Sequence, residues 1–170
     1  AVGLNHVDLE YAKEKGIQVF NAPGLNANAV AELTISKMLD ISRHTIPANQ
    51  DVKVSHIWDK YKYVGRELRG KTLGVMGFGR IGRRVAELAK AFGMDIVAYD
   101  PFLKPEDFER EGAKGMGIDE LIRVSDFISL HIPLTPETKD LFNKKSIAEM
   151  KDGAVVLNMS RGGIVNEQDM

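Results

Sequence analysis

Val75-Met76-Gly77-Phe78-Gly79-Arg80-Ile81-Gly82 is the stretch that decides the fold of this chain. It contains a G-x-G-x-x-G turn, and the flanking residues suit a nucleotide-binding unit. A short apolar strand is expected before the turn at residues 72–76, an amphipathic helix after it at residues 83–92, and a second strand at residues 95–99. This order of strand, turn, helix and strand is typical of a dinucleotide site. A glycine-rich turn without a ligand is the alternative.

Each glycine of the turn has a separate physical task. Gly77 permits the tight turn, Gly79 lets the backbone approach a pyrophosphate, and Gly82 lets helix and strand pack closely. The helix N-terminus offers unpaired N–H groups and a partial positive charge to phosphates. Asp100 ends the second strand, 23 residues after Gly77. Its carboxylate can accept hydrogen bonds from the adenosine ribose and would repel a 2′-phosphate, which predicts NAD rather than NADP.

Composition limits the classes of function. The 170 residues are 44% hydrophobic and 28% charged, which suits about one domain with a proper core. With 23 basic and 24 acidic residues the net charge is −1, which argues against binding to nucleic acid or to a membrane surface. The absence of cysteine excludes disulfides, thiol catalysis and cysteine-ligated metals, and it fits a cytoplasmic protein. We expect no metal site and no membrane-spanning segment.

Helices and strands are expected to alternate in the C-terminal part of the chain. Short helices are predicted at residues 118–124 and 144–150, with a helical turn at 105–111 and apolar strands at 126–131 and 154–158. This alternation predicts an α/β fold with a Rossmann-type, doubly wound parallel sheet covered on both faces.

The N-terminal part does not look like the start of a nucleotide domain. A helix at residues 8–15 with Asp8 as N-cap is expected to precede a strand at residues 17–20. A long apolar helix over residues 28–46, closed by Pro47, is expected to be mostly buried.

Residues 48–69 are predicted to form a short helix and a connecting arm. The segment is polar and mixed in composition, with Trp58 and the nearby Tyr61 and Tyr63 as its aromatic residues. These rings either face a subunit partner or pack locally.

A second site signal follows the last predicted strand, in Asn158-Met159-Ser160-Arg161-Gly162-Gly163. In open α/β sheets, ligands bind beyond the carboxyl ends of the strands. Arg161 at such an end suits a carboxylate, which it can bind through two parallel N–H···O bonds. It could also polarise a neighbouring carbonyl and make that carbon a better hydride acceptor. A structural arginine at a strand end is the alternative.

Together these motifs resemble the D-isomer-specific 2-hydroxyacid dehydrogenases. The glycine loop, Leu130-His131-Ile132-Pro133-Leu134-Thr135-Pro136-Glu137-Thr138 and the Arg161 motif carry the resemblance, and residues 5–9 and 21–23 also match. Residues 26–32 and 65–72 are most similar to the D-3-phosphoglycerate dehydrogenase branch. The glycerate, glyoxylate and lactate branches share most of the same motifs.

The resemblance implies a two-lobed enzyme that uses NAD and a small 2-hydroxy or 2-keto acid. On this interpretation residues 1–25 are a remnant of a flavodoxin-like substrate domain. Residues 26–70 are an interdomain helix and a dimerisation arm, and residues 71–170 are a C-terminally incomplete NAD-binding domain. The family dimerises through its NAD lobes, so we expect a homodimer.

The resemblance also assigns site residues. The backbone around Val2, Gly3 and Leu4 would lie near the substrate carboxylate, and Arg161 would bind the substrate and assist catalysis. The expected cofactor-binding residues are Gly77, Gly79, Arg80, Ile81, Gly82, Asp100, His131, Pro133, Thr138, Met159 and Ser160.

The family's general acid/base, a histidine held by a glutamate, lies C-terminal to the Arg-Gly-Gly motif. This chain ends nine residues after Arg161, and none of its four histidines matches the catalytic one. We therefore expect a truncated fragment that binds NAD with weak or no turnover, since losing a general acid costs about 10²–10⁴ in rate. His131 is either a substitute acid or a packing and cofactor-contact residue. A corepressor-type NAD-binding regulator and a simple folding or assembly unit are the alternative functions.

Overall fold

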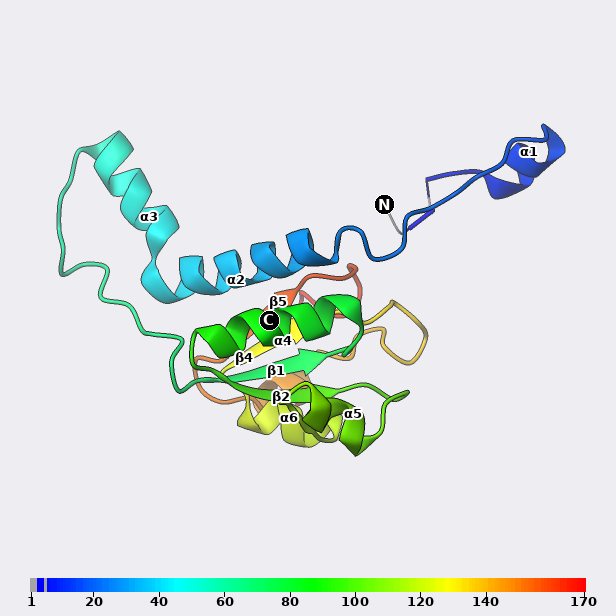
Figure 1. The fold of residues 1–170 in the computed structure, drawn as a ribbon. Coiled ribbons are helices and arrows are strands. Elements are labelled where there is room, and N and C mark those ends of the chain that lie inside the picture. Colours follow the sequence, from blue (N-terminus) through cyan, green and yellow to red (C-terminus); the bar gives the residue numbers. More distant parts are fainter. Residues whose placement is uncertain (1–2, 5) are drawn as a thin grey trace.

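A five-stranded parallel sheet lies at the centre of the computed structural model, which describes residues 3–4 and 6–170 (Figure 1). Its strands run in the order β3-β2-β1-β4-β5. Their bounds are β1 Thr72–Met76, β2 Asp95–Tyr99, β3 Lys114–Gly115, β4 Phe127–Leu130 and β5 Val155–Asn158. All four strand pairings are parallel. The predicted Rossmann-type parallel sheet is confirmed, although the two-residue β3 was not expected.

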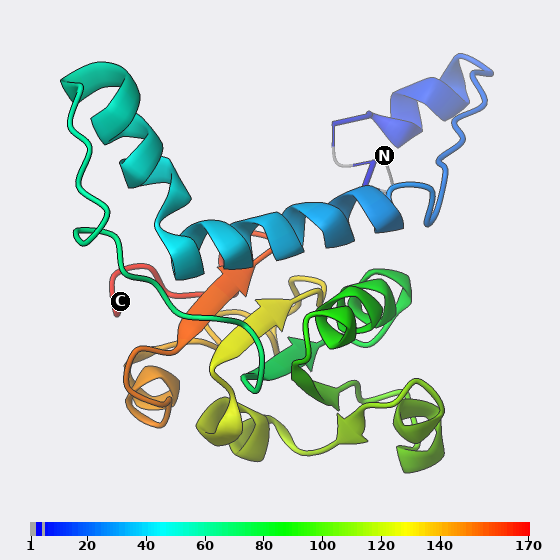
Figure 2. The same cartoon turned by 60° about the vertical axis from the view of Figure 1, so that its left-hand side comes forward.

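Helices cover both faces of the sheet (Figure 2). On one face α4 (Arg80–Ala91) packs on β1, and α2 (Ala27–Arg43) packs across α4. α5 (Pro105–Arg110) adds Phe108 to the core of that face. On the other face the core joins β4 to α6 (Ile118–Val124) and to Met150 beyond α7 (Lys144–Ala148). The central strands β1 and β4 are buried along almost their whole length, which is why they are mostly apolar runs.

The register of the strands brings the candidate residues to one edge. Met76 is level with Tyr99 of β2 and Leu130 of β4, and Leu130 is level with Asn158 of β5. The next residues along each strand therefore emerge at the same carboxyl edge. β2 lies on one side of β1 and β4 lies on its other side, so the connections that follow β1 and β3 run in opposite directions. This edge therefore includes a topological switch point, where α/β proteins bind ligands.

The long helix ends earlier than predicted. α2 stops at Arg43, His44 takes a left-handed conformation with φ of 54°, and a new helix, α3 (Thr45–Gln50), starts after it. Pro47 explains the break, because a proline ring clashes with the carbonyl four residues earlier, here that of Arg43, but is tolerated in a first helical turn. A π-helical turn, η1 (Asp51–Ser55), extends α3.

The predicted strand at residues 17–20 is wrong. α1 (Leu9–Glu14) forms with Asp8 as its N-cap, which accepts a hydrogen bond from the Tyr11 amide at 2.9 Å, but the chain after it is irregular. Ile17 and Phe20 are 58% and 83% exposed. A strand needs a hydrogen-bonding neighbour, and none of the described strands pairs with this segment. No helix in the described part of the chain is long and apolar enough to cross a membrane.

Candidate cofactor and substrate site

The glycine loop between β1 and α4 is close-packed on one side and open on the other. Gly77 has φ of 86°, which favours glycine. A Cβ on Gly82 would lie 2.1 Å from the Gly77 carbonyl oxygen, so only glycine lets the helix approach the strand this closely. At Gly79 a Cβ would meet nothing within 4 Å. The open side is therefore the side from which a ligand can reach the backbone.

The N-terminus of α4 faces this open side without a cap. Gly79 precedes the helix, and no side chain bonds to the first-turn amides, which include those of Arg80 and Ile81. Such amides and the helix dipole suit a pyrophosphate. The Arg80 side chain is engaged elsewhere, since its Nη1 donates to the Pro23 carbonyl at 2.9 Å. The backbone amide at this position is available to a ligand.

Asp100 is fixed against the glycine loop. Its Oδ2 accepts a hydrogen bond from the Phe78 amide at 2.9 Å, and its Oδ1 accepts one from the Phe102 amide at 3.0 Å. A carboxylate oxygen has two acceptor sites, so each can still accept a ribose hydroxyl. The open backbone at Gly79, the uncapped helix and this carboxylate fit a dinucleotide.

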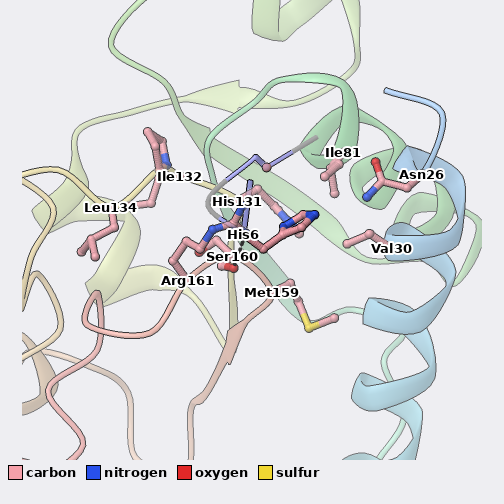
Figure 3. A pocket seen from close by; sticks show the side chains of 12 residues that line it. His6, Asn26, Val30, Ile81, His131, Ile132, Leu134, Met159, Ser160 and Arg161 are labelled. Atoms are coloured by element: carbon pink, nitrogen blue, oxygen red, sulfur yellow. Dashed lines mark hydrogen bonds between the residues drawn. The ribbon is translucent and has the colours of Figure 1, made fainter. Parts of the chain in front are cut away.

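A cavity of about 890 Å³ lies beside the loop at the carboxyl edge of the sheet (Figure 3). It brings together seven of the predicted site residues: Gly3, Ile81, His131, Pro133, Met159, Ser160 and Arg161. Five further residues line it that the sequence did not single out for this role: His6, Asn26, Val30, Ile132 and Leu134. Ile132 and Leu134 belong to the same loop as His131, and His6 and Asn26 lie in segments that carry the family resemblance. For Ile132 and Leu134, those motifs were the signal by which the residues could have been found.

Seven predicted residues do not line the cavity: Leu4, Thr138, and the glycine-loop and strand-end residues Gly77, Gly79, Arg80, Gly82 and Asp100. Thr138 braces its own loop, because its Oγ1 donates to the Pro133 carbonyl at 2.7 Å and accepts from the Thr135 amide at 2.8 Å. The Leu4 carbonyl accepts from the Val7 amide at 2.9 Å. Val2 lies outside the described residues.

The turn after β5 presents Arg161 to solvent at the cavity rim. Asn158 shapes this turn: its Oδ1 accepts from the Ser160 amide at 3.1 Å, and its Nδ2 donates to the Arg161 carbonyl at 2.7 Å. Arg161 Nη1 donates only to the neighbouring Ser160 carbonyl, at 3.0 Å. Within the described chain Arg161 forms no ion pair, so its charge is available to an anion.

His131 is a poor proton donor at neutral pH. Its Nε2 lies 2.8 Å from the Ser129 Oγ, and its Nδ1 is buried without a hydrogen-bond partner in the described structure. Burial lowers the pKa of His131 to about 4, because the charged ring would lose its solvation. The ring is therefore neutral near pH 7, which favours a packing or cofactor-contact role over that of a substitute acid.

No three His, Asp or Glu side chains of the described residues gather as metal ligands. The glycine loop, the uncapped helix, the strand-end carboxylate and the cavity at the switch point instead define a Rossmann dinucleotide-binding domain.

Residues 35–170 match the family described as D-isomer specific 2-hydroxyacid dehydrogenase, NAD binding domain. The chain belongs to this family, and the predicted cofactor, NAD, is confirmed as that of the matching domain.

Known relatives are named for different substrates. The chain is 47% identical over 167 residues to a hydroxypyruvate reductase of Thermotoga maritima, covering 98% of this chain and 53% of the relative. It is 45% identical over 168 residues to a D-3-phosphoglycerate dehydrogenase of Methanocaldococcus jannaschii, covering 98% and 32%. The chain thus spans about half or less of the length of these relatives.

Solved structures agree in fold. The structure of D-lactate dehydrogenase from Aquifex aeolicus complexed with NAD and lactic acid is 40% identical, with a TM-score of 0.83, and the match covers 99% of this chain and 50% of that one. The apo-structure of D-lactate dehydrogenase from Escherichia coli is 36% identical, with a TM-score of 0.89, covering 99% and 53%.

Proposed function

We propose that this chain is the cofactor half of an NAD-dependent dehydrogenase that interconverts a D-2-hydroxy acid and its 2-keto acid. NAD, when bound, accepts or supplies the hydride. Gly79 and the first-turn amides of α4 bind the pyrophosphate, Asp100 binds the adenosine ribose, and Arg161 holds the substrate carboxylate. Neutral His131 does not suit the task of general acid/base.

The observation that carries the proposal is the position of Arg161. Its guanidinium has no ionic partner in the described chain and lies at the rim of a cavity that also touches Ile81 in the first turn of α4. An arginine so placed can bind a carboxylate with two parallel hydrogen bonds and can polarise the adjacent carbonyl. One cavity therefore borders both the cofactor loop and a group suited to the acid end of the substrate.

For the substrate we propose 3-phosphoglycerate, which would place the protein in serine biosynthesis. The similarity to D-3-phosphoglycerate dehydrogenases over almost the whole chain supports this choice. Hydroxypyruvate and lactate are the competing substrates, supported by the relatives named above. Among the cavity-lining residues of the described chain, only Arg161 carries a permanent positive charge that can pair with an anionic group. Contacts to a substrate phosphate would therefore come from the part of the relatives that this chain does not match.

For the division of the chain, we propose that residues 1–25 belong to the substrate domain, residues 26–70 form the interdomain helix and arm, and residues 71–170 bind NAD. We further propose that the arm mediates homodimerisation. α3 and the segment after it project from the body of the domain (Figure 1), and Val54, Trp58 and Tyr61 are 75%, 81% and 74% exposed. Such a set of exposed apolar side chains on one projecting segment is typical of an interface.

Oxalate binding to the NADH-loaded chain tests the role of Arg161. Oxalate is a small planar dicarboxylate that resembles a 2-keto acid. We expect Arg161→Gln to weaken oxalate binding by about 10–100-fold, the value of a charge-assisted hydrogen-bonded pair, while NADH affinity stays within about twofold. Arg110→Gln is the matched control, because Arg110 is exposed and pairs only with Asp107 on its own helix.

Equal oxalate affinity of the wild type and Arg161→Gln, or no oxalate binding by the NADH-loaded wild type, contradicts the substrate role of Arg161. The chain should also show weak or no oxidation of NADH with 3-phosphohydroxypyruvate, hydroxypyruvate or pyruvate. Rapid turnover with any of them would mean that a group within this chain supplies the proton.

A further inference from the structure

Phe78 lies between the first two glycines of the loop, and its amide, its carbonyl and its ring each make a contact. Its amide donates to Asp100 Oδ2 at 2.9 Å, and its carbonyl accepts from Arg83 Nε at 3.0 Å. Its ring is fully buried and packs on Phe108 with 5.3 Å between the ring centroids. The Arg83 guanidinium covers the ring at 5.8 Å from the centroid. A loop residue that is anchored on all sides sets the position of the loop on either side of it.

Arg83 makes two contacts that its planar guanidinium can satisfy together. While Nε bonds to the Phe78 carbonyl, Nη1 bonds to Glu111 Oε1 at 2.9 Å. Glu111 follows α5, the helix that also carries Phe108. Arg83 therefore ties the glycine loop to the segment after α5, and Glu111 balances its charge. A lysine in its place has one nitrogen and no fixed fork, so it cannot reproduce both bonds.

We infer that Arg83 is a positioning residue for the adenosine half of the cofactor site and thereby a determinant of the choice of NAD over NADP. The inference rests on the proposed function. Arg83 acts through Phe78: it holds the loop from the carbonyl side, and Asp100 holds the same peptide segment from the amide side. With the Arg83 bond removed, Phe78 loses its support on the carbonyl side, and the Phe102 amide becomes the firmer of the two contacts that hold Asp100. A displaced carboxylate binds the ribose of NADH less well and repels a 2′-phosphate less strongly.

Arg84 provides a matched control on the same helix. Its Nε donates to Asn28 Oδ1 at 2.8 Å, and its Nη1 pairs with Glu87 at 2.7 Å. Like Arg83, Arg84 is half-buried and makes two polar contacts. Its contacts are with α2 and within α4 rather than with the glycine loop. Substitution of Arg84 therefore measures how much stability is lost when a hydrogen-bonded arginine on α4 is removed without disturbing the glycine loop.

The test is titration of the wild type, Arg83→Met, Arg83→Lys and Arg84→Met with NADH and with NADPH. We expect Arg83→Met to weaken NADH binding about tenfold and to change NADPH binding by less than threefold, so that selectivity for NADH falls. Arg83→Lys should lie between Arg83→Met and the wild type, and it serves as the test if Arg83→Met does not fold. Arg84→Met should keep both affinities within about twofold of the wild type.

The outcomes separate the two proposals. A wild type that binds NADH selectively, together with Arg83 variants that keep the same selectivity, overturns the positioning role and leaves the proposed function intact. Equal weakening of NADH and NADPH in the Arg83 variants also overturns it, because that is the effect of general destabilisation. A wild type that binds no NADH overturns the proposed function and this inference with it.

Discussion

Substitution of alanine at Gly79 and at Gly82 should separate cofactor binding from stability. The two positions are three residues apart in one loop, yet their surroundings are opposite. A Cβ at Gly82 would lie 2.1 Å from the Gly77 carbonyl oxygen and 3.0 Å from Val75 Cγ1. At Gly79 it would meet nothing within 4 Å, and the backbone φ of −78° suits an alanine.

The cost at Gly82 follows from these contacts. The carbonyl is backbone and cannot rotate away, so the helix must move, and overpacking of this kind costs about 1–3 kcal/mol. Alanine would regain at most about 1 kcal/mol in helix propensity. We expect a net loss of about 1–2 kcal/mol in the free energy of unfolding, which corresponds to a fall of about 2–8 °C in Tm for a chain of this size. Gly82→Ala should also bind NADH weakly, since the α4 N-terminus has moved.

The expectation for Gly79→Ala is the reverse. Its Tm should stay within about 2 °C of the wild type or rise, because the Cβ enters open space and restricts the unfolded chain. NADH affinity should fall by more than tenfold, because the Cβ occupies the side from which a pyrophosphate approaches the backbone. Thermal unfolding and NADH titration measure the two effects, and Gly117→Ala, also in open space, is the control for stability.

The reasoning is refuted if Gly79→Ala binds NADH as the wild type does, or if Gly82→Ala is as stable as the wild type. The first result would show that the pyrophosphate does not bind on the open side of the loop. The second would show that the contact between Gly82 and Gly77 relaxes at no cost.

Three further predictions concern other parts of the molecule. Asp100→Ala should raise the Kd for NADH at least tenfold and relax the rejection of NADPH in parallel titrations, because this carboxylate also orders the Phe78 and Phe102 amides. Unchanged NADH affinity would contradict the assignment of Asp100 as the ribose-binding residue. His131 has a pKa of about 4 in the folded chain, below the ordinary 6.5, so the unfolded state binds the extra proton and stability is lost as pH falls from 6.5 toward 4. Urea unfolding at pH 7 and pH 4.5 should show about 2 kcal/mol more acid destabilisation in the wild type than in His131→Asn, and equal pH dependence would contradict this origin. Light scattering at high protein concentration should show a wild-type dimer and a Trp58→Asp monomer, whereas a monomeric wild type would count against the arm as an interface.

The unit of β1, α4 and β2 was predictable because its signals are local. Apolar runs, the glycine turn and Asp100 lie within 30 residues of one another, and each constrains the backbone directly. The end of α2 was also open to prediction, since Pro47 forbids a continuous helix through Arg43. The strand expected at residues 17–20 failed for the opposite reason. Its apolar pattern is real, but a strand exists only where another strand pairs with it, and pairing is not a local property.

The same limit applies to the site. Residues that follow the strands, such as His131 and Arg161, could be placed at the cavity because parallel strands end at one edge. His6 and Val30 reach the cavity from the N-terminal segment and from α2, and their approach depends on packing between distant parts of the chain. The link from Arg83 to Glu111 spans 28 residues and joins α4 to the end of α5. No periodicity or motif in the sequence indicates such a pair.

The most direct test of the central claim is isothermal titration of the wild-type chain with NADH and, separately, with NADPH. We expect one NADH per chain and at least tenfold weaker binding of NADPH, because Asp100 accepts ribose hydroxyls and repels a 2′-phosphate. Absence of NADH binding, or equal affinity for the two cofactors, would contradict the assignment of the glycine loop and Asp100 as an NAD site.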